Sequence, residues 1–195
     1  MNRNVVACAV ASAVVGFCGY SFLGLYPTYL KTESGFSTTD VGLVAGMFAI
    51  GSMPGIPAGW LGDRFNPRWV LIIATGANMA LGWLLFNVHT APVGQALLSI
   101  GYGTLASGVL IVNLYALVQR SVSPGAVGRA SGVFLAATYL PASVSGYAFA
   151  ALQSAYGWGV AAAIQMTCLP VIGIAALLAL DLRKLGKPTA APTGA

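Results

Sequence analysis

Six long apolar runs, separated by short segments that hold the charges, dominate this sequence. Each run is about 20 residues or longer, which is the length that a helix needs to cross a hydrocarbon core about 30 Å thick. The runs cover residues 5–30, 40–61, 69–88, 92–118, 129–152 and 157–180. They are rich in Ala, Leu, Val and Gly without strict polar alternation, so the strands of a barrel are not expected. The pattern predicts an all-α membrane protein whose six transmembrane helices form one domain over residues 1–182.

Composition excludes an ordinary soluble domain. Hydrophobic residues make up 57% of the 195 and charged residues only 7%, against roughly a quarter charged in a typical soluble domain. A soluble fold of this length would lack the polar residues to cover its exterior. The net charge of +5 comes from residues scattered between the apolar runs, with no cluster that could follow a phosphate backbone. We therefore expect the lipid bilayer, and not nucleic acid, as the partner of this surface.

The basic residues are divided unequally between the two sets of loops. With six spans, eight of the nine lie on the side that holds both termini, and only Lys31 lies on the other side. Basic residues gather on the cytoplasmic side of membrane proteins. We therefore expect a multi-pass protein of the cell inner membrane with both termini in the cytoplasm. Residues 183–195 end in a Pro-, Ala- and Thr-rich stretch and are predicted to form a disordered cytoplasmic tail.

The loop after the second run carries a motif. It reads Gly59-Trp60-Leu61-Gly62-Asp63-Arg64-Phe65-Asn66-Pro67-Arg68. This segment resembles the signature between the second and third helices of each half in the major facilitator superfamily: glycine, leucine, Asp-Arg, a small residue and one or two basic residues. The matching positions are Gly59, Leu61, Asp63, Arg64 and Arg68, whereas Asn66 and Pro67 replace the usual glycine and basic residue. The segment 124–132 also resembles the start of the fifth or eleventh helix in that superfamily.

Members of this superfamily have two six-helix halves, so the resemblance covers one half. The N-terminal half usually carries an arginine in its fourth helix, whereas the run 92–118 has no charge. The segment 25–30, followed by Gly35-Phe36-Ser37, resembles the end of the seventh helix in organic-acid and sugar transporters of the superfamily. We therefore expect a C-terminal half, either as a fragment or as a unit that pairs with a second six-helix unit, which could be another chain or a second copy.

The resemblance implies a secondary active transporter that moves a small organic solute by alternating access between two such units. Because no Asp, Glu, Lys, Arg or His lies at mid-membrane in these runs, the titrating group of a proton symporter would belong to the second unit. The alternative is a non-transporting membrane interaction protein that associates with another transporter half. An enzyme is not expected, because the sequence has no phosphate-binding glycine loop, metal-ligand cluster or nucleophile with a His partner. No cofactor and no metal are predicted.

The motif loop contains an acid in an unfavourable place. Asp63 lies at the C-terminal end of a predicted helix, where its charge opposes the helix dipole, so it requires a cation or the N-terminus of another helix. Arg64, Arg68 and Arg129 are the candidate cations on that side. The resemblance implies that this loop latches the cytoplasmic ends of helices. The alternative is a topogenic turn with one incidental acid.

Neutral polar residues at membrane depth are candidates for contact with a solute. Tyr26, Asn113, Tyr139 and Gln165 could line a cavity and hydrogen-bond a polar solute without charge. Alternatively, such residues join helices, and Tyr20 and Tyr26 are near enough to span ends to act as interfacial anchors.

Glycine and proline predict close contacts and bends. Gly42, Gly46, Gly51 and Gly55 recur along the second run and favour close helix packing inside the bundle. The alternative is a sliding surface between two halves during alternating access. Pro141, between Gly132 and Gly146, makes the fifth helix the best candidate for bending.

Overall fold

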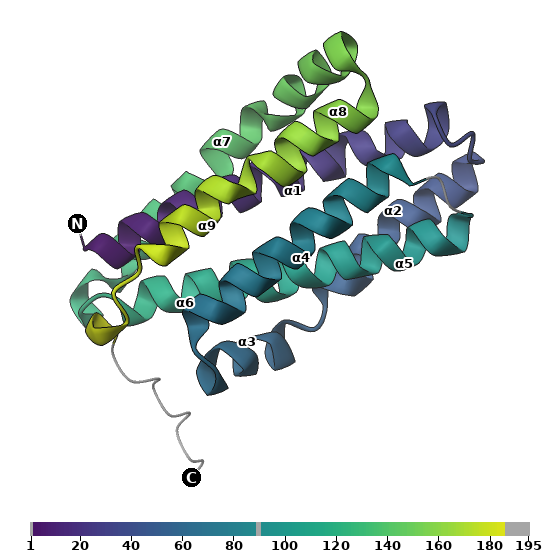
Figure 1. Cartoon of the computed structure of the whole chain (residues 1–195). Helices are drawn as coiled ribbons and strands as arrows, with labels where there is room; N and C mark the ends of the chain where they lie inside the picture. Colours follow the sequence, from purple (N-terminus) through teal and green to yellow (C-terminus); the bar gives the residue numbers. More distant parts are fainter. Residues whose placement is uncertain (1, 89–90, 186–195) are drawn as a thin grey trace.

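The computed structural model describes residues 2–88 and 91–185, which fold into helices joined by short turns. Within these ranges, five helices are long and apolar enough to cross a membrane, and a bent pair supplies a sixth span. Figure 1 shows the helices running side by side along a common direction. The prediction of an all-α fold with six spans is confirmed.

The first span is one helix, α1 (Arg3–Thr32). The Asn2 side chain accepts a hydrogen bond from the Asn4 N–H at 3.3 Å and so caps its N-terminus. The chain turns after the helix at Gly35, whose φ is 65°. Thirty helical residues extend about 45 Å, which exceeds the hydrocarbon core. Helix α1 packs against α7 (Val127–Tyr156) and α9 (Pro170–Leu178), the helices of the fifth and sixth spans.

The second span is broken where a single helix was predicted. It consists of α2 (Thr38–Ser52) and α3 (Gly55–Arg64), which are bent by 45° relative to each other. Pro54 and Pro57 lack the N–H groups that would continue the helical hydrogen bonds, which explains the break. By contrast, α7 runs without interruption through Pro141. The break in helical structure thus lies in the second span, and a bend of the fifth helix at Pro141 stays a prediction.

The third span begins at the two residues that depart from the usual motif. In α4 (Pro67–Asn87), the Asn66 side chain accepts from the Arg68 N–H at 3.1 Å, and Pro67 occupies the first helical position. An Asn cap followed by Pro is a favourable helix start, because Pro has no N–H to leave unsatisfied there. The replacements therefore have a local structural role.

Two spans change from α-helix to wider π-helix at membrane depth. The fourth span comprises α5 (Pro92–Gly103), η1 (Thr104–Ile111) and α6 (Val112–Arg120). The sixth comprises α8 (Trp158–Ala162), η3 (Ala163–Cys168) and α9.

In η3 a proline explains the widening. The Leu169 N–H donates to the Ile164 carbonyl five residues earlier, at 3.0 Å. Pro170 has no N–H to donate and crowds the preceding turn. The carbonyl of Gln165, which Leu169 would bond in an α-helix, instead accepts from the Cys18 thiol of α1 at 3.0 Å.

The core contains two clusters of different composition. One is mainly aliphatic and the other is mainly aromatic. The aliphatic cluster includes Leu71, Leu110, Leu114, Leu117, Phe134 and Leu177. The aromatic cluster includes Phe22, Tyr26, Tyr29, Phe86, Tyr102 and Phe149.

Polar contacts bring the two ends of the described chain together at one end of the bundle, called here the terminal end. The Asn2 side chain donates to the Ser121 carbonyl at 2.7 Å. The Asn4 side chain donates to the Asp181 carbonyl at 2.9 Å and accepts from the Asp181 N–H at 2.7 Å. A short 3-10 helix, η4 (Leu182–Lys184), follows. Of the predicted tail, residues 186–195 lie outside the described residues.

Candidate functional site

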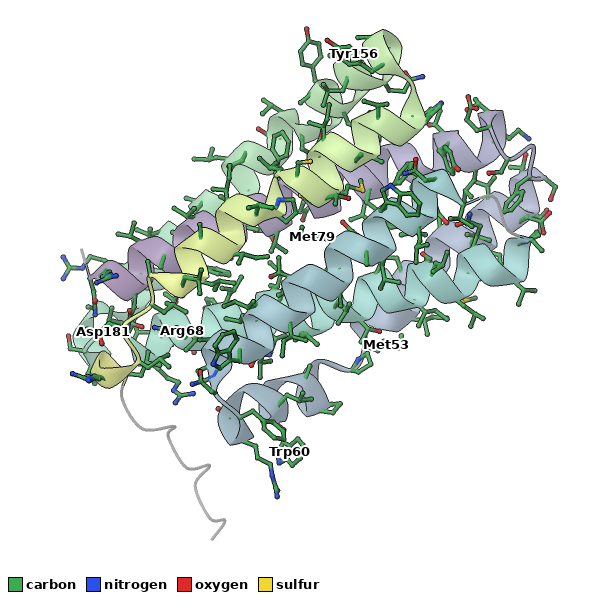
Figure 2. All side chains as sticks on the ribbon, in the orientation of Figure 1. Met53, Trp60, Arg68, Met79, Tyr156 and Asp181 are labelled. Carbon is green, nitrogen blue, oxygen red and sulfur yellow. The ribbon has the colours of Figure 1, made fainter. Side chains whose placement is uncertain are left out.

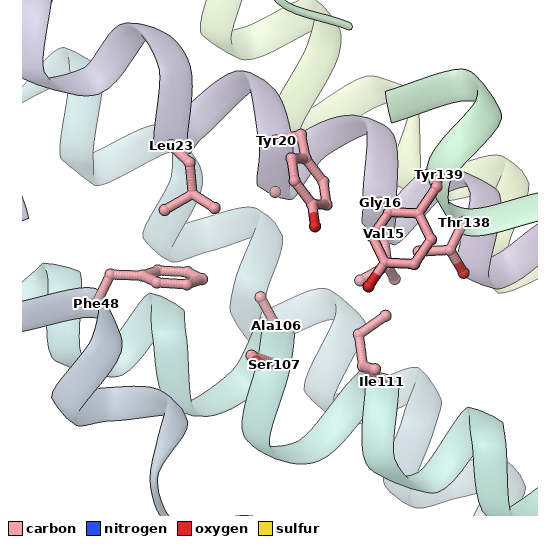
Figure 3. Close-up of a pocket in the computed structure, with 11 residues that line it drawn as sticks. Val15, Gly16, Tyr20, Leu23, Phe48, Ala106, Ser107, Ile111, Thr138 and Tyr139 are labelled. Atoms are coloured by element: carbon pink, nitrogen blue, oxygen red, sulfur yellow. The ribbon is translucent and has the colours of Figure 1, made fainter. Parts of the chain in front are cut away.

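A cavity of about 260 Å³ lies beside the middle of α1, between α1, α2, η1 and α7. Figure 3 shows the rings of Tyr20 and Tyr139 projecting into the space between these helices, with Phe48 and Ile111 across from them. The residues that line the cavity are uncharged. Its hydrogen-bonding groups come from two phenols and from the hydroxyls of Ser107 and Thr138.

Glycine and aromatic residues shape the wall between α1 and α7. A Cβ on Gly16 would collide with the Thr138 carbonyl, so only glycine permits this approach of the two helices. Tyr20 and Tyr139 then meet edge to face, with ring centroids 5.8 Å apart. Both rings remain partly open, at 43% and 52% exposed. The arrangement offers two amphipathic rings whose hydroxyl groups can turn toward a bound solute.

The structure does not gather the four predicted cavity residues into one site. Tyr139 lines the cavity, but the other three are buried among helices. The Tyr26 hydroxyl donates to Gln95 Oε1 at 2.8 Å. Tyr26 is therefore not an interfacial anchor, and Tyr20 lies in the middle of its helix rather than near an end.

The two amides join helices in the way that the alternative reading expected. Asn113 Nδ2 donates to the carbonyls of Ala58 and Val109, at 3.0 and 2.9 Å. Gln165 Nε2 donates to the Ser145 carbonyl at 3.2 Å and to the Ser21 hydroxyl. A side-chain amide at membrane depth gains from interhelical hydrogen bonds because lipid offers none. These bonds satisfy the donor groups of both residues without a solute, while the buried Gln165 Oε1 has no hydrogen bond among the described residues.

The motif loop pairs its acid with an arginine that sequence reasoning did not select. Asp63 Oδ1 lies 3.3 Å from Arg120 Nη1, and the two side chains are 56% and 22% exposed. Arg120 is in the last turn of α6. A cation there is favoured by the helix dipole, and this position is the signal that could have identified it.

The three predicted cations have other surroundings. Arg64 stacks over the Trp60 ring, 5.1 Å from its centroid. Arg68 donates to the Leu180 carbonyl after α9, and Figure 2 places it at the same end of the bundle as Asp181. Arg129 is exposed at the start of α7. Among the described residues, the ion pair of Asp63 is with Arg120 and not with any of these three.

The rest of the motif packs α3 against α6. Gly62 leaves room for the Asn113 amide, which a Cβ at that position would strike. A Cβ on Gly59 would make an ordinary contact with Val112 at 3.7 Å. Leu61 is 38% exposed, so its side chain remains available to lipid or to another chain.

Of the four predicted packing glycines, two lie at contacts between helices and two do not. Gly51 permits α2 to approach the Ile100 carbonyl, and a Cβ on Gly55 would lie 3.7 Å from Val112. By contrast, a Cβ on Gly42 or Gly46 would meet nothing within 4 Å. The packing prediction is therefore wrong for Gly42 and Gly46 within this chain, because they face open space. Gly103, which was not selected, makes the matching approach of the fourth span to Phe48.

Comparisons with known proteins agree with this architecture. The model of the Major Facilitator Superfamily matches residues 3–195. The chain is 33% identical over 151 residues to the probable nitrate/nitrite transporter NarK2 of Mycobacterium tuberculosis, an alignment that covers 74% of this chain and 37% of that protein. It is 27% identical over 157 residues to the probable L-galactonate transporter of Escherichia coli, covering 75% of this chain and 32% of that one.

Solved structures show the same fold. The peptide transporter POT in complex with sulfate superposes with a TM-score of 0.81 at 17% identity, over 96% of this chain and 40% of the transporter. A bacterial homologue of the lysosomal transporter Spinster gives a TM-score of 0.67 at 15% identity, over 97% of this chain and 52% of that one. The chain thus spans about half or less of each protein that it matches. With a family model that covers nearly all of its residues, the chain belongs to the Major Facilitator Superfamily.

Proposed function

We propose that this chain acts as one six-helix half of a secondary active transporter, which moves a small solute by alternating access. The observation that carries the proposal is the cavity of about 260 Å³ with uncharged hydrogen-bonding groups. Four different spans contribute to its wall, so a relative movement of these spans would change its shape. The relatives with named activities are transporters, which supports the same reading.

The proposed solute is small and polar, and an organic anion is the case we favour. The names of two relatives refer to nitrate or nitrite and to L-galactonate, all of which are anions. Because the cavity lining is uncharged, this half would supply neutral hydrogen bonds. The positive charge for an anion, and the titrating group of a proton symporter, would come from a second six-helix unit.

The second unit would cover the open side of the cavity. Large side chains on α7 support this assembly because they are exposed next to Tyr139: Leu140 is 71% exposed and Tyr147 is 82% exposed. Open glycines at Gly42 and Gly46 on α2 would allow a helix of the second unit to approach closely. Whether this unit is another chain or a second copy is decided by the assembly size in mild detergent.

We place the terminal end in the cytoplasm, with the protein in the inner membrane. The excess of basic residues at that end supports this orientation. Thr38→Cys, at the opposite end, should react with an impermeant thiol reagent in intact cells, whereas Gly125→Cys should not. A labelled Gly125→Cys protein would reverse the proposed orientation.

Transport itself is tested with the full chain in proteoliposomes, alone and together with a matching six-helix unit. Uptake of labelled nitrate and of labelled L-galactonate is measured for the parent, for Tyr20→Phe and Tyr139→Phe, and for the control Tyr156→Phe at the end of α7, which does not line the cavity. Loss of one cavity hydroxyl that bonds the solute should lower affinity about fivefold or more, while the control transports like the parent. An assembly that takes up neither solute nor any other of a broad panel would support the non-transporting interaction protein instead.

A further inference from the structure

Asn78 of α4 is a buried amide whose carbonyl oxygen has no hydrogen bond in the described structure. The residue is 8% exposed, and its Oδ1 atom has no hydrogen bond. Asn113, another buried Asn, makes two bonds to carbonyls. A buried polar group that lacks a partner destabilises a protein, so the surroundings of Asn78 call for a ligand that can supply one.

A second unsatisfied group lies beside it. The Tyr102 side chain is fully buried, and its hydroxyl has no hydrogen bond within the described residues. This ring interacts with Asn78 and Cys18, but neither gives the hydroxyl a bond of acceptable geometry. Asn78 Oδ1 and the Tyr102 hydroxyl, on neighbouring spans, are therefore two polar groups without a hydrogen bond that lie close together.

A small cavity adjoins this location. It has a volume of about 20 Å³ and lies between α1, α4, the fourth span and α9. Its lining includes Asn78, Thr75 and Cys18, together with Pro170 and Gly173. The Thr75 hydroxyl donates to the Leu71 carbonyl at 2.7 Å, so its oxygen is still able to accept a bond.

We propose that this cavity is a binding site for a single water molecule, held by the Asn78 amide. A volume of about 20 Å³ accommodates one water, and a buried water requires about two to four polar partners. The Thr75 oxygen supplies a second partner, and the Cys18 sulfur of α1 also lines the site. The site is too small for a transported solute or a lipid chain, and its uncharged lining does not suit an ion. The water thus satisfies the Asn78 amide of α4 beside Cys18 of α1.

Gly173 provides the test because it can fill the cavity. A Cβ there would meet Val14 at 3.8 Å and Ala11 at 3.9 Å, which are ordinary contacts with two other lining residues. In the parent, the methyl group of Gly173→Ala would displace the water and leave the Asn78 amide unsatisfied. In an Asn78→Val background, which has no amide to satisfy, the same methyl group would only fill space.

The apparent Tm of the full chain in lipid nanodiscs is measured for the parent, both single variants and the double variant. Gly173→Ala should lower Tm in the parent and raise it in the Asn78→Val background, with shifts that differ by about 3 °C or more. Gly76→Ala on α4, where a Cβ meets nothing within 4 Å, controls for helix propensity and should shift Tm equally in both backgrounds.

Equal shifts for Gly173→Ala in the two backgrounds would show a dry cavity and overturn the proposal. A structure of the parent at a resolution that reveals ordered water gives an independent answer that needs no variant. Density within hydrogen-bonding distance of the Asn78 amide is expected. Its absence there, with other buried waters visible, would also overturn the site.

Discussion

At the terminal end of the bundle, α1, α3, α4 and α6 are tied to one another or to neighbouring turns by polar contacts such as Asp63–Arg120 and Asn4–Asp181. In the aromatic cluster, rings from four spans stack instead. The centroid of Phe22 lies 4.5 Å from that of Tyr26 and 4.6 Å from that of Tyr102. The terminal end is therefore held by polar contacts, whereas the aromatic cluster is held by closely packed rings.

This difference suggests which part moves. A polar contact near the membrane surface can be replaced by water or by a group of another chain at little cost. Closely packed rings lose many contacts at once when they separate. We expect the aromatic cluster to move as one body during transport, while the terminal end opens and closes. Each of the following variants tests that division, from the largest expected effect to the smallest.

Phe86→Ala should cause the largest loss. Phe86 is 2% exposed and its ring contacts several rings of the cluster, including Tyr29 at 4.9 Å and Phe149 at 5.5 Å between centroids. Truncation would leave a cavity and cost about 3–5 kcal/mol of stability, measured by denaturation in nanodiscs. Phe65→Ala, at a residue 56% exposed, is the matched control and should cost far less. Similar losses for the two would remove the contrast between the regions.

Asn4→Ala should have an intermediate effect. Asn4 is fully buried and satisfies both the N–H and the carbonyl of Asp181. Leaving these groups without a partner should cost about 2 kcal/mol of stability. Asn4→Asp retains the acceptor but loses the donor, so its loss should be measurably different from that of the alanine variant. A loss as large as that of Phe86→Ala would place a rigid element at the terminal end.

Asp63→Asn should change conformation more than stability. Because Asp63 is more than half exposed, loss of its ion pair should cost less than about 1 kcal/mol. If the pair is a latch, Gly132→Cys should react faster with a thiol reagent in membranes, and transport should slow. The exchange Asp63→Arg with Arg120→Asp should restore the parent's rate of labelling. Unchanged labelling in Asp63→Asn would leave the loop as a topogenic turn.

Arg64→Gln should have the smallest effect. It removes an interaction with the exposed Trp60 ring, and cation–π contacts at exposed sites contribute about 0.5–1 kcal/mol. The denaturation midpoint should therefore move less than for Asn4→Ala, with insertion into the membrane unchanged. A larger shift would show that α3 depends on this contact for its position beside α6.

The apolar runs were enough to predict six spans, because their length and composition are local properties of the sequence. The break at Pro54 was harder to rank against Pro141, since both prolines remove one hydrogen bond. What separates them is the surroundings. Pro54 is followed by Gly55 and Pro57, whereas Pro141 lies in a helix that packs along α1. Whether a proline interrupts a helix depends on how that helix packs. The residues next to the proline do not determine this packing.

The candidate site was predicted less well, for a similar reason. A polar residue in a span needs a hydrogen-bonding partner, but the sequence does not show whether that partner is a solute or another helix. Tyr139 faces the cavity, whereas Asn113 and Gln165 find carbonyls on neighbouring spans. Arg120 was missed because the bend at Pro54 sets the direction of α3 and so brings Asp63 to α6.

The two hydrogen bonds between Asn4 and Asp181 also bear on how the bundle is assembled. They join residues 177 positions apart, and α1 packs mainly against helices that are synthesised after it. Helix α1 is thus made before the two helices against which it packs most. During synthesis the buried faces of α1, including Asn4, would lack their partners until α7 and α9 are made. Contacts between residues so far apart in sequence form slowly, so this step would slow folding. Chaperone or translocon protection of α1 would then limit the yield of folded protein more than the insertion of any later helix.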